Sequence, residues 1–329
     1  MVARVACLSP YDEATVQALF KGRHEVHVTL APPPPAQAEV MAACVDADVV
    51  IADRRHKHRV DRDVLQNMRR CRLIQQAAVG FDSIDHRAAA ELGIPVANAA
   101  GYNKDSVADW TVMAMIALLR HSFSLDRQLR AGHWNADDQM RGEETMGREL
   151  GAMTVGIIGM GNVGSAVARR VLAFGAKILF ADTLQRSFEG ARQVELDNLL
   201  EQSDIVCVHA PLDVDTRALI GASEIARMKK GAYLINAARG PIVDEASLTD
   251  ALQSGHLAGA GLDVFEVEPL PTNSPLRKIE NVILAPHRGG ATVEAEQRLL
   301  EVVGDNLVRV LDGRPPLNVV NGLSTAAIR

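Results

Sequence analysis

The sequence predicts an α/β fold made of two parallel sheets, each covered by helices on both faces. Short β-branched or otherwise apolar runs alternate with amphipathic helical windows along the chain, as expected for parallel strands joined by helices. The 329 residues are too many for one small core and are near the length of two domains. We therefore expect two doubly wound α/β domains.

The N-terminal part of the chain predicts the first sheet. Its strands are expected at residues 2–8, 25–29, 48–52, 73–77 and 95–98. Its helices are expected at residues 13–21, 36–46 and 61–68. Between them, residues 32–35 are four prolines, for which a stiff loop is favoured over a polyproline II ligand for another domain.

A second sheet is predicted after a long helix from about residue 106 to 131 and a polar, poorly periodic stretch. Its six strands are expected at residues 153–159, 177–181, 204–209, 232–236, 258–262 and 282–285. Helices are expected at residues 162–174, 196–202, 222–228, 244–253 and 292–311. Six strands with these connections make a complete dinucleotide-binding sheet.

Composition narrows the class of partner. The net charge of -6 disfavours nucleic acid and anionic membranes, and no apolar run is long enough to span a bilayer. The first residues resemble a strand rather than a secretory signal, so we expect a cytoplasmic protein. Four scattered cysteines without a CxxC pair favour buried thiols over disulfides or a metal site. A small molecule is the expected partner.

The strongest local motif is a GxGxxG sequence where an apolar strand ends and an amphipathic helix begins. Gly159 would allow the tight turn, Gly161 would let backbone approach a pyrophosphate, and Gly164 would let helix and strand pack closely. The phosphates would meet the free amides at the helix N-terminus. The motif in this context predicts a Rossmann-type dinucleotide site.

The residue that ends the next strand indicates which dinucleotide binds. Asp182 lies 18 residues after Gly164, where a carboxylate accepts the hydroxyls of the adenosine ribose. It would repel a 2′-phosphate. Arg186 is close enough in sequence to leave NADP as the less favoured alternative, so NAD is predicted.

Three polar side chains follow strands of the second sheet and could act on a keto acid. Arg239 follows the strand at 232–236, Glu268 lies in the loop after the strand at 258–262, and His287 follows the strand at 282–285. Ligands of such sheets bind outside the carboxyl ends of the strands. A cation, a proton donor and a carboxylate that orients the donor are what reduction of a carbonyl requires.

At this point the sequence resembles the NAD-dependent D-isomer-specific 2-hydroxyacid dehydrogenases. The resemblance covers nearly the whole chain and includes the segments at residues 79–85, 93–98, 106–109 and 209–216, the GxGxxG motif and the three polar segments in family order. It implies a flavodoxin-like substrate domain, residues 1–100 plus 291–329, and an inserted NAD-binding domain, residues 101–290. It also implies hydride transfer between NAD(H) and a D-2-hydroxy acid and 2-keto acid pair.

The resemblance gives roles to the catalytic candidates. Arg239 would bind the substrate carboxylate and carbonyl oxygen, for which a guanidinium fork is well suited. His287 would be the acid and base, and Glu268 would fix the imidazole tautomer and favour its charged form. By itself each residue could be an ordinary surface or turn residue, but their order and spacing favour function.

Further residues match positions that contact the cofactor or substrate in this family. The cofactor set comprises Val107, Gly159, Gly161, Asn162, Val163, Gly164, Asp182, Ala210, Pro211, Thr216, Ala237, Arg239, Asp263, His287 and Gly290. The amides of Val79 and Gly80 would hold the substrate carboxylate. Arg55, and less firmly Lys57, align with basic positions that bind a substrate phosphate in phosphoglycerate dehydrogenases, although a solvated basic turn is the favoured interpretation.

Other classes of function stay open from the sequence alone. The main alternative is a non-enzymatic NAD-sensing interaction module of the co-repressor type, and a further one is formate oxidation, which a glutamine in place of Glu268 would favour. By resemblance, the long helix from about residue 106 would support a homodimer. The acid itself is not determined among glycerate, hydroxypyruvate, glyoxylate, phosphoglycerate and bulkier 2-keto acids.

Overall fold

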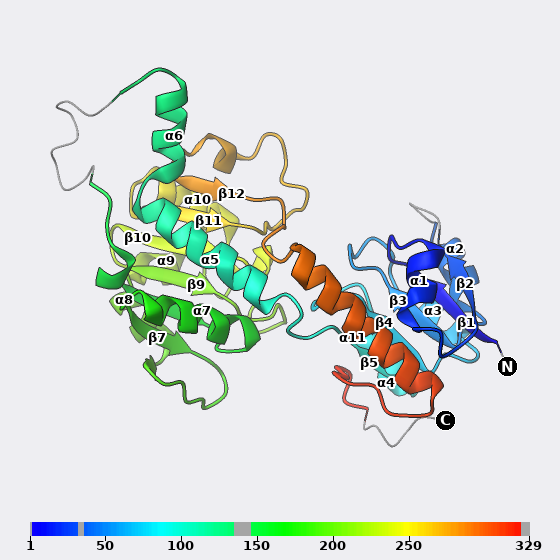
Figure 1. Cartoon of the computed structure of the whole chain (residues 1–329). Helices are drawn as coiled ribbons and strands as arrows, with labels where there is room; N and C mark the ends of the chain where they lie inside the picture. The colour runs from blue at the N-terminus through cyan, green and yellow to red at the C-terminus, as the bar shows by residue number, and fades with distance from the viewer. Residues whose placement is uncertain (1, 32–35, 135–145, 324–329) are drawn as a thin grey trace. The chain divides into compact units, whose positions relative to one another are not determined.

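The computed structural model describes residues 2–31, 36–134 and 146–323. The proline tract at 32–35 and most of the polar stretch before the second sheet lie outside these ranges. The chain separates into two compact units (Figure 1). Unit 1 comprises Met1–Asn103 with Thr292–Arg329, and unit 2 comprises Lys104–Ala291.

Unit 1 is a five-stranded parallel sheet in the order β2-β1-β3-β4-β5, which is the flavodoxin-like order. Its strands are β1 Ala3–Cys7, β2 Val26–Leu30, β3 Val49–Ala52, β4 Leu73–Gln76 and β5 Val96–Ala97. Its helices are α1 Glu13–Leu19, α2 Gln37–Cys44, α3 Arg62–Asn67, α4 His86–Glu91 and α11 Val293–Leu311. Apolar residues alternate between the faces, so one face packs against α1 and α11 and the other against α2, α3 and α4.

Unit 2 is a seven-stranded parallel sheet in the order β12-β11-β10-β9-β6-β7-β8. Its strands are β6 Thr154–Ile158, β7 Lys177–Ala181, β8 Ala191–Gln193, β9 Ile205–Val208, β10 Ala232–Asn236, β11 Leu257–Leu262 and β12 Val282–Leu284. Its helices are α5 Lys104–Leu119, α6 Ser122–Arg130, α7 Asn162–Ala173, α8 Leu196–Gln202, α9 Ala222–Arg227 and α10 Glu245–Gln253. Short 3-10 turns lie at Leu150–Ala152, Gly240–Ile242 and Pro275–Lys278.

In unit 2 the chain adds strands in one direction from β6 to β8 and in the other direction from β9 to β12, so the order reverses between β6 and β9. In a Rossmann sheet a dinucleotide crosses the carboxyl ends of the strands at this switch point. One face packs against α5 and α7, and the other packs against α8, α9 and α10. The predicted fold class is therefore confirmed, with β8 as a strand beyond the six predicted.

One predicted helix is wrong. The single helix expected from residue 106 to 131 is two helices, α5 and α6, separated at His121. His121 has a φ of +51°, a left-handed conformation that an α-helix cannot continue through. No glycine or proline marks this break in the sequence.

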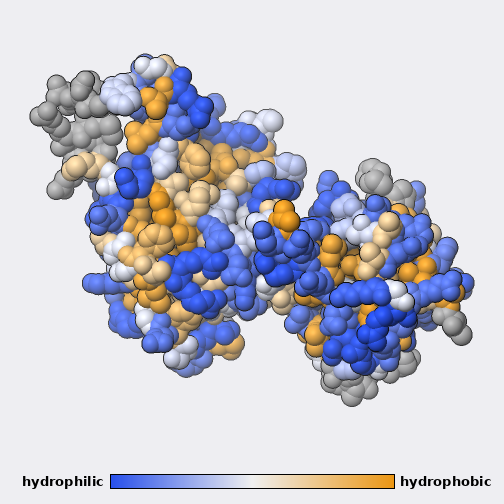
Figure 2. Space-filling model, in the orientation of Figure 1, coloured by the Kyte–Doolittle hydropathy of each residue, from blue (hydrophilic) through white to orange (hydrophobic). Residues whose placement is uncertain are grey.

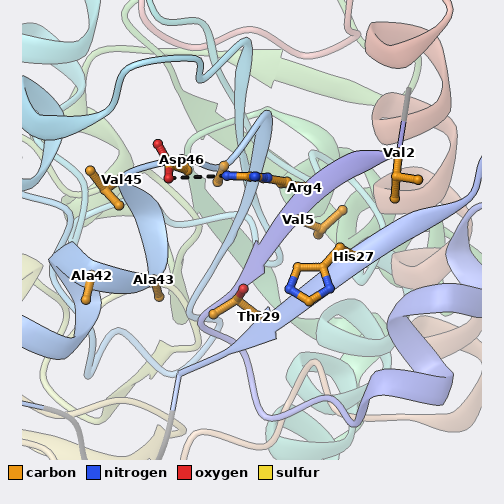
Figure 3. A pocket seen from close by; sticks show the side chains of 10 residues that line it. Val2, Arg4, Val5, His27, Thr29, Ala42, Ala43, Val45 and Asp46 are labelled. Atoms are coloured by element: carbon orange, nitrogen blue, oxygen red, sulfur yellow. Dashed lines mark hydrogen bonds and ion pairs between the residues drawn. The ribbon is translucent and has the colours of Figure 1, made fainter.

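A hollow of about 540 Å³ lies in unit 1 beside β1, β2 and α2 (Figure 3). Arg4 and Asp46 form an ion pair of 3.2 Å in it, and His27 and Thr29 line its other side. Both members of the ion pair are about half exposed. None of the predicted site residues lines this hollow.

None of the helices in the described part of the chain combines the length and apolar character needed to cross a membrane.

Candidate active site

The glycine loop leaves the carboxyl end of β6 and leads directly into α7. Gly159 has a φ of +90°, which L side chains rarely adopt, and a Cβ there would lie 2.8 Å from the Ala210 amide nitrogen. A Cβ on Gly164 would collide with the Gly159 carbonyl oxygen, so this glycine permits close packing of helix on strand. Gly161 precedes α7 and has open space where a Cβ would stand. This arrangement fits a dinucleotide pyrophosphate at the helix N-terminus.

Asp182 directly follows β7 and is hydrogen-bonded to the glycine loop. Its carboxylate accepts the amides of Met160 and Leu184, each at 2.9 Å, and pairs with the Arg186 Nε at 2.9 Å. Burial raises the pKa of Asp182, but these amides and Arg186 outweigh it and hold the pKa below its usual value. An ionised carboxylate is therefore fixed where the adenosine ribose of a dinucleotide would lie. Arg186, considered above as a phosphate ligand, is paired with this carboxylate.

Arg239 lies just beyond β10 on a tightly packed loop. The Asn236 side chain donates to the Arg239 carbonyl oxygen at 3.0 Å and accepts the Ala238 amide at 3.1 Å. A Cβ on Gly240 would collide with the Phe265 backbone, so this loop packs directly on the segment that leads to Glu268. The half-buried Arg239 also lies close enough to Glu268 to lower the pKa of that carboxyl group.

His287 and Glu268 form a hydrogen-bonded pair. The distance between His287 Nδ1 and Glu268 Oε2 is 2.8 Å, and the other Glu268 oxygen accepts the Phe265 amide at 3.1 Å. Burial raises the pKa of Glu268, but the hydrogen bond and charge of His287, with the Phe265 amide and Arg239, bring it below the usual value. The carboxylate is thus ionised at neutral pH and fixes one ring nitrogen of the imidazole. The His287 side chain is 47% exposed, so the pair is accessible to a small ligand.

The loop that carries His287 is held by a buried aspartate. The two oxygens of Asp263 accept the amides of Arg288 and Gly289, each at 2.7 Å. The His287 amide donates to the Asp263 carbonyl oxygen at 2.8 Å. His287 itself has a φ of +53°, a conformation that non-glycine residues adopt only when surrounding contacts impose it. Asp263 therefore sets the position of the loop, a role that the sequence did not indicate.

The other predicted cofactor residues of unit 2 lie on neighbouring segments. Asn162 and Val163 form the first turn of α7, and Val107 is buried in α5. Ala210, Pro211 and Thr216 follow β9, where the Thr216 hydroxyl donates to the Pro211 carbonyl oxygen at 2.6 Å. Ala237 follows β10, and Gly290 comes directly after the amides held by Asp263.

The predicted substrate residues Val79, Gly80 and Arg55 belong to unit 1. Val79 and Gly80 follow β4, and the Asn98 side chain donates to the Val79 carbonyl oxygen at 2.7 Å. Arg55 lies in the loop after β3, with its Nε 3.6 Å from Asp53.

Asp53 organises this basic loop, which sequence reasoning missed. Its buried carboxylate accepts the amides of Arg55 and Lys57 at 3.0 Å and pairs with His58 Nδ1 at 2.5 Å. The neighbouring Arg54 is bound to Glu296 at 2.7 Å. The only signal in the sequence was an aspartate at the end of an apolar strand.

Comparison with known proteins agrees with this geometry. Residues 112–289, more than half of the chain, match the family described as D-isomer specific 2-hydroxyacid dehydrogenase, NAD binding domain. A glyoxylate reductase of Thermofilum pendens is 41% identical over 293 residues, which are 88% of this chain and 85% of that protein. A D-3-phosphoglycerate dehydrogenase of Archaeoglobus fulgidus is 34% identical over 97% of this chain but only 59% of that protein.

A solved structure gives the same result. The D-lactate dehydrogenase of Aquifex aeolicus, complexed with NAD and lactic acid, is 28% identical. The aligned region covers 98% of this chain and 100% of the D-lactate dehydrogenase chain, with a TM-score of 0.83.

The protein is an NAD-dependent oxidoreductase, as its Rossmann sheet, a glycine loop shaped for a pyrophosphate and these similarities together indicate. More particularly, the chain belongs to the D-isomer-specific 2-hydroxyacid dehydrogenase family. It is a 2-keto acid reductase with NAD as its cofactor, which confirms the enzyme class and the cofactor predicted from the sequence.

Proposed function

We propose that this enzyme interconverts a small 2-keto acid and its D-2-hydroxy acid, with Arg239, Glu268 and His287 as the catalytic residues. The observation that carries the proposal is the 2.8 Å pair of His287 and Glu268 on a loop fixed by Asp263, with Arg239 close to the same carboxylate. These residues come from loops after β10, β11 and β12, at the edge of the sheet where ligands bind.

Each residue has a distinct task in reduction. Bound NADH supplies the hydride to the keto carbon. Arg239 binds the substrate carboxylate and polarises the carbonyl, since its guanidinium can donate to both groups. His287 donates a proton to the carbonyl oxygen, and in oxidation it takes the proton back from the hydroxyl. Glu268 orients the imidazole and stabilises its positive charge.

We further propose glyoxylate and hydroxypyruvate as the substrate class, in which the group beside the keto carbon is small. The support is the names of relatives, several of which are glyoxylate reductases or a glyoxylate/hydroxypyruvate reductase. Unit 1 is proposed as the substrate domain, with the amides of Val79 and Gly80 binding the substrate carboxylate. Arg55 is proposed to contact substrates that carry a second anionic group.

The test follows NADH absorbance with a panel of 2-keto acids, using the wild type and His287→Gln. We expect turnover of the small acids by the wild type and a loss of about 100-fold or more in kcat for His287→Gln, because general acid catalysis contributes about that much. NADH affinity, measured by fluorescence, should be similar in both proteins. A wild type that bound NADH but reduced none of the small acids would overturn the proposed substrates. A fully active His287→Gln would overturn the proposed acid.

We also propose a homodimer formed through α6. No residue of α6 is buried, and Phe123, Leu125 and Leu129 are 46%, 38% and 56% exposed. Apolar side chains lie at the surface of unit 2 along this helix (Figure 2). A second copy would cover this face symmetrically.

Light scattering after size exclusion tests the dimer with Leu129→Glu and, as the control on the same helix, Arg130→Gln. We expect a wild-type dimer that Leu129→Glu converts to a monomer and Arg130→Gln leaves intact. A monomeric wild type at micromolar concentration would refute the dimer.

A further inference from the structure

His209 directly follows β9, and both nitrogens of its ring are buried. Its amide donates to the carbonyl oxygen of Ile158, the last residue of β6, at 2.8 Å. It is also adjacent to the glycine loop, because a Cβ on Gly159 would lie 2.9 Å from the His209 carbonyl carbon. Since β6 and β9 flank the switch point of the sheet, His209 lies at the edge where a dinucleotide crosses.

Strand alternation determines the direction of the imidazole. Val206, Val208 and Ala210 pack in the core on the side of α8, α9 and α10, whereas Ile205 and Cys207 pack on the side of α5 and α7. Alternation places His209 with Ile205 and Cys207. Its side chain is therefore on the face that α5 and α7 cover. The glycine loop lies at the N-terminus of α7, which packs on that face of the sheet (Figure 1).

The two nitrogens of the imidazole have no polar partner among the described residues. Both ring nitrogens are inaccessible to solvent, and neither has a hydrogen bond to any atom in the described ranges. His58, the other histidine with a buried unpaired nitrogen among the described residues, binds Asp53 through its second nitrogen. Burial lowers the pKa of His209 to about 4, so the ring is neutral at physiological pH, with one donor and one acceptor. Native proteins rarely leave such groups unpaired, because each one costs free energy.

We propose that His209 is a cofactor-binding residue whose neutral imidazole hydrogen-bonds an oxygen of the phosphate and ribose backbone of NAD. Asp182 after β7 and Arg239 after β10 lie on either side of β6 and β9, so the part of the cofactor between the adenosine and the nicotinamide crosses at His209. A ribose hydroxyl can pair with either ring nitrogen, by accepting from the protonated one or donating to the other, whereas a phosphate oxygen can accept only from the protonated one. The inference rests on NAD as the cofactor and adds a residue to those proposed above.

The competing interpretation is that His209 only fills space in the core, and apo stability separates the two. His209→Leu removes the unpaired nitrogens and keeps an apolar side chain. If His209 binds the cofactor, the His209→Leu apo protein should be as stable as the wild type or more stable and should bind NADH more weakly. If His209 only fills space in the core, His209→Leu should have a lower apo Tm and unchanged NADH affinity.

The experiment measures the NADH dissociation constant by fluorescence and the apo Tm for wild type, His209→Leu and His209→Gln. We expect His209→Leu to bind NADH about tenfold more weakly, as loss of one hydrogen bond to the ligand predicts. His209→Gln keeps a donor and an acceptor and should recover most of the affinity. Cys207→Ala, two residues earlier on the same face, is the matched control and should lower Tm without changing the NADH constant.

Cofactor fragments locate the contact. AMP, ADP-ribose and NADH are titrated into each variant. A loss in His209→Leu shared by all three places the contact on the adenosine side, and a loss for ADP-ribose and NADH alone places it on the pyrophosphate or second ribose. Unchanged affinity for all three overturns the proposal.

A second measurement keeps the test valid if His209→Leu fails to fold. The ring ¹⁵N resonances of wild-type His209, assigned by their loss in His209→Gln, should shift on saturation with NADH, and no shift would overturn the proposal. Failure of the wild type to bind NADH would instead overturn the cofactor assignment, so the two failures are distinguishable.

Discussion

Two loops in this molecule are built by the same device in different units. In unit 2 the loop that carries His287 is held through its amides by the buried Asp263, and in unit 1 the loop at residues 54–59 is held through its amides by the buried Asp53. Each loop contains a histidine in the left-handed region, His287 with φ +53° and His56 with φ +57°. In both, one carboxylate at a strand end imposes a backbone that the loop alone would not adopt.

The two aspartates differ in what compensates their charge. Burial raises the pKa of Asp53, but the His58 hydrogen bond and the loop amides bring that pKa below the usual value. Burial raises the pKa of Asp263, and the amides of Gly289 and Arg288 with the charge of His287 only partly offset this, so its pKa lies above the usual value. The difference indicates that Asp53 contributes to the stability of its unit, whereas the contacts of Asp263 serve chiefly to position the His287 loop.

The largest expected effect is on the His287 loop. In Asp263→Asn one of the two amides now held at 2.7 Å would face an NH₂ group, so the loop must shift. A displacement of about 1 Å at a reacting group costs about 100-fold, and we expect kcat for keto acid reduction to fall by that factor. Steady-state kinetics check this, and the exposed Asp250→Asn in the same unit is the control.

A pH profile distinguishes positioning from a general loss of structure. If Asp263 acts through His287, its asparagine variant should alter the limb of the pH–rate profile that depends on the catalytic acid, while its Tm stays near that of the wild type. A variant with normal kcat would show that the loop does not need the carboxylate.

In the loop of unit 1, loss of the aspartate should lower the stability of the protein rather than kcat. Asp53→Asn weakens the pair with His58 and at least one amide contact, and breaking a buried pair of this kind costs about 2–3 kcal/mol. Chemical denaturation monitored by circular dichroism measures this loss. Asp12→Asn, at an exposed helix cap of the same unit, should change stability much less, because asparagine is also a good cap. Equal losses would contradict the special role of Asp53.

The two carboxylates should also respond to pH with opposite signs. Because the pKa of Asp53 is lowered in the folded state, its contribution to stability is present above the ordinary value of 3.8 and is lost as pH falls through the lowered pKa. Because the pKa of Asp263 is raised, its contribution is present below 3.8 and is lost as pH rises through the raised pKa. Acid unfolding curves of the two asparagine variants should therefore diverge from the wild type in opposite directions.

Most of the fold could be predicted because its strands are buried apolar runs. Strands such as β3 and β9 are buried along their whole length, so each is a continuous apolar run in the sequence. Such a run can be recognised without knowing which segments pack against it. β8 is only three residues long and partly exposed, so it gave no such signal. The break between α5 and α6 at His121 depends on a left-handed residue that composition does not mark.

The candidate site divides in the same way. The glycine loop and the strand-end position of Asp182 follow from local backbone geometry, which the residue types specify. Other features depend on how the chain packs. These are the amide contacts of Asp53 and Asp263 and the ring nitrogens of His209 that have no hydrogen-bond partner in the described part of the chain. Such contacts exist only after packing and could not be derived from spacing.

A smaller effect is expected at Glu268. Glu268→Gln keeps a hydrogen-bonding group beside His287 but removes the negative charge, so we expect about a tenfold lower kcat for reduction at neutral pH. Steady-state kinetics of keto acid reduction over a range of pH measure this loss. Glu266→Gln, an exposed neighbour in the same loop, is the control. An unchanged profile would remove Glu268 from the proposed mechanism.

The smallest effect is expected at Arg55. Its substitution tests whether the loop at residues 54–59 binds substrate or is only a structural turn. Its side chain is 40% exposed and 3.6 Å from Asp53, so solvent screens its charge and limits its contribution. We expect Arg55→Gln to raise KM a few-fold for 2-keto acids that carry a second anionic group and to leave KM for glyoxylate within twofold. Arg59→Gln, exposed in the same loop, is the matched control. Equal KM changes for both kinds of acid would mean that Asp53 holds this loop for stability alone.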